Sequence, residues 1–315
     1  MDGFETYIAD SVPTAGRTGR RLTLYLGLAV LLAAATLAAV NSRGGAGAKL
    51  PRVVAPNAGS ACNSTPGNGF GYTNTVDGTT MTVCISQEGN INQINFPDTA
   101  ASHKQIAWDG YCLGDLDSSV LYNDFSPGSG VAFSGWGAAT LTQTPPNQVN
   151  VTRSSLDGKY QLTQFIKINF QPRSIFVGMT VKNTDTVTHH FLFSRTVAPA
   201  IDNSAANDQY NQYGVGALLG TAQFGRTGLA FESAGPGTNS LAFGPTQKDG
   251  LVYSAPVSGF IASGGCIASA DRGFQATGNR VLVGSIGDPS TSDYKHYTLA
   301  PNASVNVGKF VYRML

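Results

Sequence analysis

Four aspartates lie close together in residues 108–124, at a density typical of cation sites. They are Asp109, Asp115, Asp117 and Asp124. Calcium takes about six to eight oxygen ligands in a flexible geometry, so a loop carrying these side chains could bind it. The spacing is not that of an EF-hand loop, and aspartate is also common in turns. The sequence therefore predicts either a calcium site at these residues or ordinary turn aspartates.

Five aromatic residues fall in loop-like stretches rather than in strand patterns. They are Trp108, Tyr111, Trp136, Tyr210 and Tyr213. The apolar face of a sugar ring stacks on an exposed aromatic face, so such a set is typical of a carbohydrate-binding surface. The competing interpretation is that these rings fill the ends of the protein core.

The cysteines are even in number and are typical of disulfides formed in an oxidising compartment. Cys62, Cys84, Cys112 and Cys266 allow three pairings. We favour Cys62 with Cys84 and Cys112 with Cys266, because the second bond would join early and late parts of one closed domain. Their spacing matches no zinc motif.

The elements that must position these residues are predicted to be β-strands. Glycine is frequent and glutamate is rare, a composition that disfavours long helices. Alternating runs on either side of Asp77 and Gly78 predict a hairpin. Ile91 and Ile94 differ in parity, which indicates a β-bulge.

The most regular alternation of apolar and polar residues covers residues 159–195. Its period of two predicts three antiparallel strands, which we place as a meander at the centre of the sheets. Residues 258–263 are predicted as a short strand. Residues 303–313 are predicted as a final strand, enclosed or at a sheet edge. The fold class is therefore all-β, a large antiparallel two-sheet sandwich or supersandwich after one N-terminal hydrophobic helix.

An apolar segment without charge, residues 22–40, precedes this body and is long enough to span a bilayer as a helix. Arg17, Arg20 and Arg21 lie before it, so we expect the N-terminus inside the cell. An uncleaved anchor fits the length of the segment. A cleaved signal peptide is the alternative. The predicted division is a cytoplasmic tail, an anchor or signal, a linker and one β-sandwich domain, at residues 1–21, 22–40, 41–68 and 69–315.

Basic and acidic residues balance from Lys49 onward, and no basic stripe runs along the chain. Nucleic acid is therefore not an expected partner. Membrane contact is expected only through residues 22–40.

Residues 88–113 resemble the opening of galactose-mutarotase-like supersandwich domains, including the N-terminal domains of bacterial glucoamylase-type enzymes. Gly89, Ile91, Ile94, Phe96 and Pro97 carry this resemblance: a glycine, an aliphatic strand and an aromatic-proline ending. It implies a large sandwich often met around carbohydrates. Glucoamylase activity is not expected, because the helical barrel that performs hydrolysis in those enzymes has no counterpart here.

The mutarotase reaction implied by this resemblance needs an acid and a base flanking a sugar ring, usually a glutamate and a histidine. His189, His190 and Glu232 are the candidates. His189 shares its parity with Val187 and Phe191, so a packed histidine is the alternative.

Three functions follow for an extracytoplasmic protein that is membrane-anchored or secreted. We favour a non-catalytic module that binds a carbohydrate or another envelope polymer, with no cofactor other than calcium. A structural subunit that self-assembles through strand edges such as residues 303–313 is the first alternative, and an epimerase-like enzyme is the second.

Overall fold

The computed structural model describes Cys62 and most of the chain from Asn68 onward. The chain divides into two compact units, Met1–Val54 and Ala55–Leu315, and every described residue belongs to the second. The predicted anchor at residues 22–40 lies outside the described residues. Within those residues, no helix combines the length and apolar character needed to cross a membrane. The undescribed positions after Asn68 are 100–102, 127–128, 131–132, 145, 204–207, 215–225, 233–238, 247–249, 267–275, 278–279 and 289–292.

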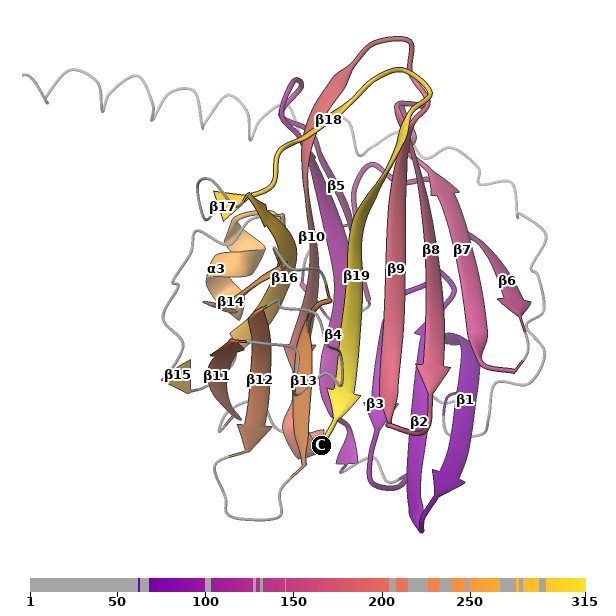
Figure 1. Cartoon of the computed structure of the whole chain (residues 1–315), viewed down its shortest axis with the longest axis vertical. Helices are drawn as coiled ribbons and strands as arrows, with labels where there is room; N and C mark the ends of the chain where they lie inside the picture. The colour runs from indigo at the N-terminus through magenta and orange to yellow at the C-terminus, as the bar shows by residue number, and fades with distance from the viewer. Residues whose placement is uncertain are drawn as a thin grey trace, which may run out of the picture. The chain divides into compact units, whose positions relative to one another are not determined.

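Antiparallel strands form nearly all the regular structure of the described residues (Figure 1). A three-stranded sheet has the order β1 (Asn68–Val76), β2 (Thr79–Ser86), β3 (Ile91–Asn95). A seven-stranded sheet has the central order β14 (Gly250–Pro256), β16 (Arg280–Asp288), β10 (His189–Pro199), β4 (Ile106–Asp115), β5 (Leu121–Phe125), with β17 (Asp293–Tyr294) on β16 and β18 (Tyr297–Leu299) on β10.

The largest sheet has nine strands and runs β15 (Ala276–Thr277), β11 (Asp208–Gly214), β12 (Arg226–Glu232), β13 (Ser240–Pro245), β19 (Ser304–Met314), β9 (Ser174–Asn183), β8 (Tyr160–Asn169), β7 (Gln148–Ser154), β6 (Thr140–Thr144). Two short helical segments are described, η2 (Ile201–Asn203) and α3 (Val257–Ala262). The described part of the chain is therefore an all-β protein.

The seven- and nine-stranded sheets enclose one hydrophobic core. Leu162 and Val177 project into it from the nine-stranded sheet, and Leu113 and Phe193 from the other. The three-stranded sheet adds its own buried side chains, including Val83, to the same core. Each large apolar side chain buried in this way contributes about 1.5–3 kcal/mol, so the facing sheets are held mainly by the hydrophobic effect.

The predicted hairpin and bulge are both confirmed. Asp77 and Gly78 form a two-residue turn between β1 and β2, with φ angles of 51° and 74°. Positive φ at both central positions is what the favoured hairpin turn requires, and glycine adopts it without strain. Cys84 pairs with Gln93 and Ile85 pairs with Ile91, so β3 has one extra residue between these two partners. As a result Ile91 and Ile94 are both buried although they differ in parity.

The predicted meander over residues 159–195 is correct for two strands and wrong for the third. β8 and β9 pair along their whole lengths, and their predicted inner faces are buried. β10 instead crosses to the seven-stranded sheet, where it lies between β4 and β16. Val187, predicted on its inner face, lies before the strand and is 53% exposed. A period of two reports which side chains are buried but not which sheet a strand joins.

Of two further strand predictions, the one for residues 258–263 is wrong and the one for residues 303–313 is confirmed. Residues 257–262 form helix α3, where buried Phe260 contacts the rings of Trp108 and Phe125. These tertiary contacts outweigh the local strand preference. The final strand β19 is enclosed rather than at an edge, because β9 pairs with it along most of its length and β13 pairs with residues 310–314. The proposed assembly edge at residues 303–313 is therefore largely occupied.

The disulfides join Cys62 with Cys84 and Cys112 with Cys266, which is the favoured pairing. The second bond links β4 to the residues after α3 across 154 positions of sequence. Closing so long a loop restricts the unfolded chain by about 5 kcal/mol in the chain-entropy view.

Gly110 and Gly114 on β4 offer a matched test of the packing. A Cβ atom at Gly110 would lie 2.6 Å from the Cα of Phe125, whereas at Gly114 the nearest atom, from Leu121, is 3.5 Å away. We expect Gly110→Ala to lower the free energy of unfolding by about 1–3 kcal/mol, because backbone must move. Gly114→Ala should leave it nearly unchanged. Urea denaturation followed by tryptophan fluorescence measures both, and equal effects would contradict the close approach of β4 and β5.

Candidate functional site

The four aspartates of the predicted calcium site do not come together. Asp109 and Asp115 face the same side of β4, six positions apart, which separates them by about 20 Å along the strand. Asp124 lies on β5 opposite Tyr111, in the interior. One ion cannot bind all four, because its ligands must lie within about 2.6 Å of it. The aspartates belong instead to two groups with different surroundings.

The first group is a set of buried ion pairs between the sheets. Arg195 on β10 forms an ion pair with Asp109 and donates to the hydroxyl of Tyr312 and to Gln164 Oε1, the latter at 3.1 Å. Tyr312 in turn donates to Asp109, and so does the backbone amide of Ile91, at 3.0 Å. Burial opposes the charge of Arg195, but Asp109 and Tyr312 outweigh it and hold the guanidinium pKa above its ordinary value.

The second buried pair joins Arg153 on β7 to Asp124. Arg153 also donates to the hydroxyl of Tyr111, at 3.2 Å, and to the carbonyl of Gly137. Burial raises the pKa of Asp124 to about 6, with the guanidinium of Arg153 opposing that shift. Both arginines use their donors inside the protein, so these pairs hold the core.

We expect Arg195→Met to lower the free energy of unfolding by about 3–5 kcal/mol, because it leaves the carboxylate of Asp109 buried without its cation. The double substitution Arg195→Met/Asp109→Asn should be more stable than Arg195→Met alone. The neutral amide oxygen of the asparagine can still accept from Tyr312 and Ile91. Urea denaturation of the two variants measures the difference, and a double variant weaker than the single one would contradict this account.

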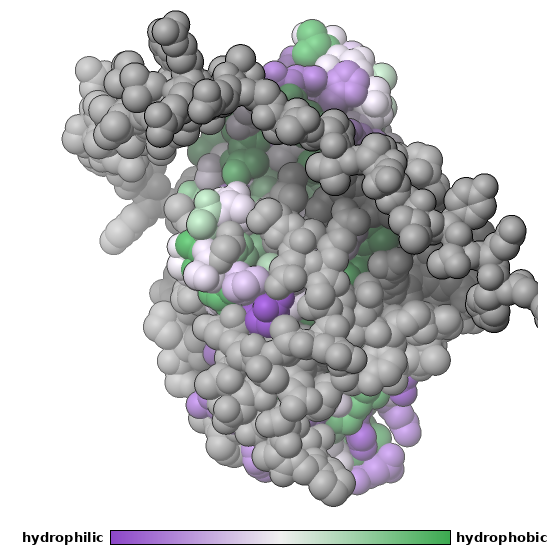
Figure 2. All heavy atoms as spheres, turned by 90° about the vertical axis from the view of Figure 1, so that its left-hand side faces the viewer, coloured by the Kyte–Doolittle hydropathy of each residue, from purple (hydrophilic) through white to green (hydrophobic). Residues whose placement is uncertain are grey.

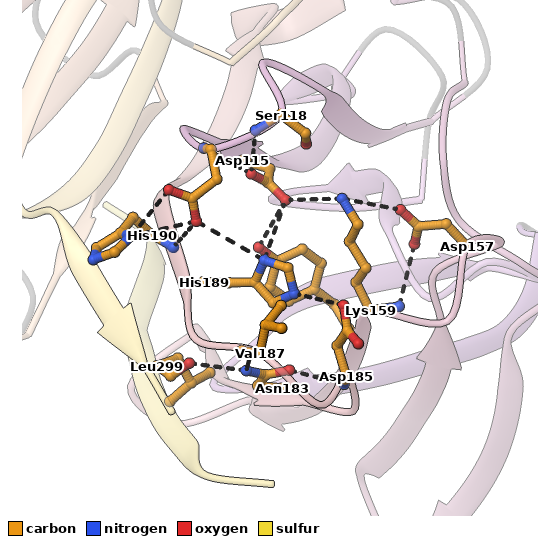
Figure 3. Close-up of polar contacts among 12 residues, drawn as sticks. Asp115, Ser118, Asp157, Lys159, Asn183, Asp185, Val187, His189, His190 and Leu299 are labelled. Atoms are coloured by element: carbon orange, nitrogen blue, oxygen red, sulfur yellow. Dashed lines mark hydrogen bonds and ion pairs between the residues drawn. The ribbon is translucent and has the colours of Figure 1, made fainter. Parts of the chain in front are cut away.

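The second group lies at one end of the sandwich, where the β4–β5, β7–β8 and β9–β10 turns meet (Figure 3). We call it the turn-end cluster, comprising Asp115, Asp117, Asp157, Lys159, Asp185, His189 and His190. Asp115 and Asp117 come from the predicted calcium set. The two histidines come from the predicted catalytic set.

Asp115 is the buried centre of the turn-end cluster. Its Oδ1 accepts the backbone amides of Asp117 and Ser118, both at 2.9 Å, which folds the β4–β5 turn around the carboxylate. Its Oδ2 accepts the hydroxyl of Tyr160 at 3.0 Å and lies 3.6 Å from the ammonium of Lys159. The β4–β5 and β7–β8 turns are thereby attached to one carboxylate (Figure 3).

The two histidines begin β10 and point in different directions. His189 is buried, and its Nε2 lies 3.0 Å from Asp185 Oδ2. His190 is half exposed, and its backbone amide donates to Asp117 at 2.7 Å while its Nδ1 lies 3.0 Å from the same carboxylate. Asn183 secures this start of β10, because its side-chain amide donates to the carbonyls of Val187 and Leu299 (Figure 3).

The turn-end cluster is negatively charged at neutral pH. Burial opposes the ionisation of Asp115 and Asp157, but hydrogen bonds and Lys159 outweigh it and lower their pKa values. The backbone amide of His190 lowers the pKa of Asp117, and that of Thr186 lowers the pKa of Asp185. The cluster therefore holds four carboxylates and one lysine, which makes this end attractive to cations and to hydroxyl donors.

Exposed apolar side chains lie in the same three turns as these carboxylates. Leu156 is 75% exposed in the β7–β8 turn, and Leu116 and Val187 stand exposed in the other two turns. Figure 2 shows hydrophobic and hydrophilic residues side by side at its upper end. The end of the sandwich thus combines acceptors of hydrogen bonds with apolar surface.

Three of the five residues in the predicted aromatic set do not lie at a surface. Trp108, Tyr111 and Trp136 are buried, with contacts to other core rings. The competing interpretation, in which such rings fill the core, describes these three. Tyr210 and Tyr213 lie on β11, and their side chains fall outside the described residues. A sugar ring cannot stack on a buried indole, so replacing Trp136 would test folding rather than binding.

The predicted acid–base set is not assembled either. Glu232 is the last residue of β12 and lies next to the residue that pairs with Ser240 of β13. β13 pairs with β19, and β19 pairs with β9 near Ser174, so the end of β12 and the start of β9 lie at the same end of the sheet. His189 lies at the other end of β9, about 30 Å away, because it pairs with Leu299, whose carbonyl accepts from Asn183. The side chain of Glu232 lies outside the described residues, but its backbone is too distant to share a sugar ring with either histidine.

Sequence reasoning did not select Asp157, Lys159 and Asp185 for the site. Each lies in a short polar turn between strongly alternating strands, at Asp157-Gly158-Lys159 and Asn183-Thr184-Asp185. Such turns are common for purely structural reasons. What identifies these residues as part of a site is that their turns lie at the same end of the sheets as the β4–β5 turn. That position can be known only from the order of the strands in the sheets.

Comparison with known proteins supports the fold. No protein-family description matches this sequence, and no characterised protein matches it. The structure of a bacterial glucoamylase complexed with acarbose aligns with a TM-score of 0.50 and 8% identity, covering 74% of this chain and 30% of that one. This chain thus spans less than a third of the glucoamylase. The likeness confirms the expected resemblance at the level of the fold.

Two looser likenesses were found. A putative aldose 1-epimerase from Escherichia coli K12 aligns with a TM-score of 0.41 and 10% identity, covering 78% of this chain and 98% of that one. A protein from Synechocystis sp. PCC 6803 aligns with a TM-score of 0.37 and 9% identity, covering 78% and 95%.

Proposed function

We propose that this chain is an extracytoplasmic β-sandwich module that binds a carbohydrate or another envelope polymer and does not transform it. The observation that carries the proposal is the mixed surface at the turn-end cluster. Carboxylates of Asp117 and Asp157 are about two-fifths exposed there, and the exposed side chains of Leu156 and Val187 lie in turns of the same end. The glucoamylase that shares the fold was solved with the sugar analogue acarbose, which is consistent with this assignment.

Carbohydrates suit such a surface for a chemical reason. Their hydroxyl groups donate hydrogen bonds to carboxylates, and charged acceptors strengthen those bonds. Their CH faces need apolar contact, which Leu116, Leu156 and Val187 offer without an aromatic platform. All three apolar residues lie in turns, where side chains stay accessible while the strands behind them remain fixed.

The extracytoplasmic location rests on the cysteines and on the N-terminal segment. Disulfides such as Cys62–Cys84 and Cys112–Cys266 persist in oxidising compartments and are rare in the cytosol. Residues 22–40 would then serve as an anchor or a signal, with residues 1–21 inside the cell.

Binding without chemistry is favoured over an epimerase-like reaction. That reaction needs an acid and a base on opposite sides of a sugar ring. Glu232 lies near the far end of the sandwich from His189. Each histidine is instead engaged by a neighbouring carboxylate, Asp185 for His189 and Asp117 for His190.

The proposal is tested by applying the full-length chain to a microarray of bacterial and plant polysaccharides. We expect binding to at least one polymer, weakened about 10- to 100-fold by Asp157→Asn, because one charge-assisted hydrogen bond of about 1.5–3 kcal/mol is lost. Leu156→Ser should also weaken binding through lost apolar contact.

Asp77→Asn in the β1–β2 turn is the matched control, since Asp77 is likewise an exposed turn aspartate but lies outside the turn-end cluster. Its binding should equal that of the unchanged chain. Absence of binding to every polymer, or equal binding by Asp157→Asn and Asp77→Asn, would refute the proposal. Catalysed interconversion of sugar anomers by the unchanged chain would refute its non-catalytic part.

A further inference from the structure

His189 is held among three carboxylates with one ring nitrogen lacking a hydrogen bond. Its Nε2 lies 3.0 Å from Asp185 Oδ2, and an ionised carboxylate only accepts, so Nε2 carries the proton. In the neutral ring Nδ1 is then an acceptor. This nitrogen is buried and has no hydrogen-bond partner. It faces Asp115 Oδ2 at 3.8 Å and Asp117 Oδ2 at 3.9 Å.

Three acceptors that face one another need a positive charge between them. A proton on Nδ1 would draw a carboxylate to about 2.7–3.2 Å, closer than either distance observed. Ligands bound to one first-row divalent ion, at about 2.0–2.2 Å each, lie about 3–3.5 Å apart. The ligand atoms of Asp115, Asp117 and His189 all lie within 4.8 Å of one another. A small closing movement would therefore place them around a single metal ion.

We propose that Asp115, Asp117 and His189 bind one divalent transition-metal ion of the Zn²⁺ type, with Asp185 as a positioning residue. The proposal goes beyond carbohydrate binding and does not depend on it. An imidazole beside two carboxylates suits zinc or manganese, whereas calcium prefers oxygen ligands alone and in greater number. The histidine is what separates this site from the calcium site predicted from the aspartates.

The surroundings of the three ligands fit this role. Metal-binding histidines usually donate their second N–H to a carboxylate, which fixes the ring and raises its basicity, and Asp185 occupies that position. Asp115 Oδ2 accepts from Tyr160, and Asp117 Oδ2 accepts from the amide of His190, so both carboxylates are themselves held by hydrogen bonds, as metal-binding carboxylates usually are.

Access and charge also fit. The side chain of Asp117 is 43% exposed, so an ion can enter from solvent and water can complete its coordination. Asp157 and Asp185 add negative charge around the three ligands, opposed by the ammonium of Lys159.

The test is equilibrium dialysis of the untagged full-length chain against Zn²⁺, with bound metal measured by mass spectrometry. We expect about one ion per chain and little binding of Ca²⁺ at the same concentration. His189→Phe keeps a ring of similar size beside Tyr160 and should abolish binding. Asp185→Asn should weaken it about 10- to 100-fold, as is usual for the partner of a metal-binding histidine.

His103→Phe is the matched control. His103 lies 2.8 Å from Asp98 in an aspartate–histidine pair at the surface, but belongs to no group of three candidate ligands among the described residues. Its zinc binding should equal that of the unchanged chain. Circular dichroism of each variant shows whether it is folded.

Nitrogen-15 NMR of the unchanged chain keeps the test decisive if the His189 variants do not fold. We expect one histidine Nδ1 resonance to shift on adding Zn²⁺, as a coordinated nitrogen does. Failure to retain Zn²⁺, unchanged retention in a folded His189→Phe variant, or a doubly protonated His189 that Zn²⁺ does not alter would each overturn the proposal.

Discussion

The ion pair between Arg195 and Asp109 is the constraint to which the rest of the sandwich conforms. Arg195 projects from β10 and Asp109 from β4, and Tyr312 and Gln164 reach them from the opposite sheet. Both charges are fully buried. A buried charge without its partner costs several kcal/mol, so the four strands that carry these side chains must meet in one arrangement.

This requirement fixes strand register as well as sheet packing. A slip of one residue would turn the inward side chains of a strand to its other face. On β4 such a slip would remove Asp109 from Arg195 and also withdraw Asp115 from Tyr160. The same alternation therefore positions a structural carboxylate in the core and a second one at the turn-end cluster. The two aspartates have the same residue type and different roles because only one lies where the strand reaches a turn.

Local structure was predictable where a few neighbouring residues determine it. The Asp77-Gly78 hairpin, the bulge in β3 and the inner faces of β8 and β9 all follow from spacing and turn chemistry. The destination of β10 was not predictable in this way, because apolar alternation is the same in either sheet. Partners for its ladder come from β4 and β16, far away in sequence.

The candidate site was harder to predict than the fold for a related reason. Asp117 and His190 are 73 positions apart in sequence, and Asp115 and Tyr160 are 45 apart. Each was visible alone as a turn aspartate, a patterned histidine or a core tyrosine. Only the order of strands brings three separate turns to one end. The position of each aspartate relative to that end then distinguishes those that face arginine from those that face histidine.

The Cys112–Cys266 bond has a consequence for what a protease can do to the molecule. It closes a ring that contains β5 to β14, so a single cut in any turn between the two cysteines leaves both pieces covalently joined. The cut ends would remain in their sheets, since neighbouring strands still pair with them. Loops in this region can therefore be long and accessible without making the integrity of the molecule depend on an unbroken backbone.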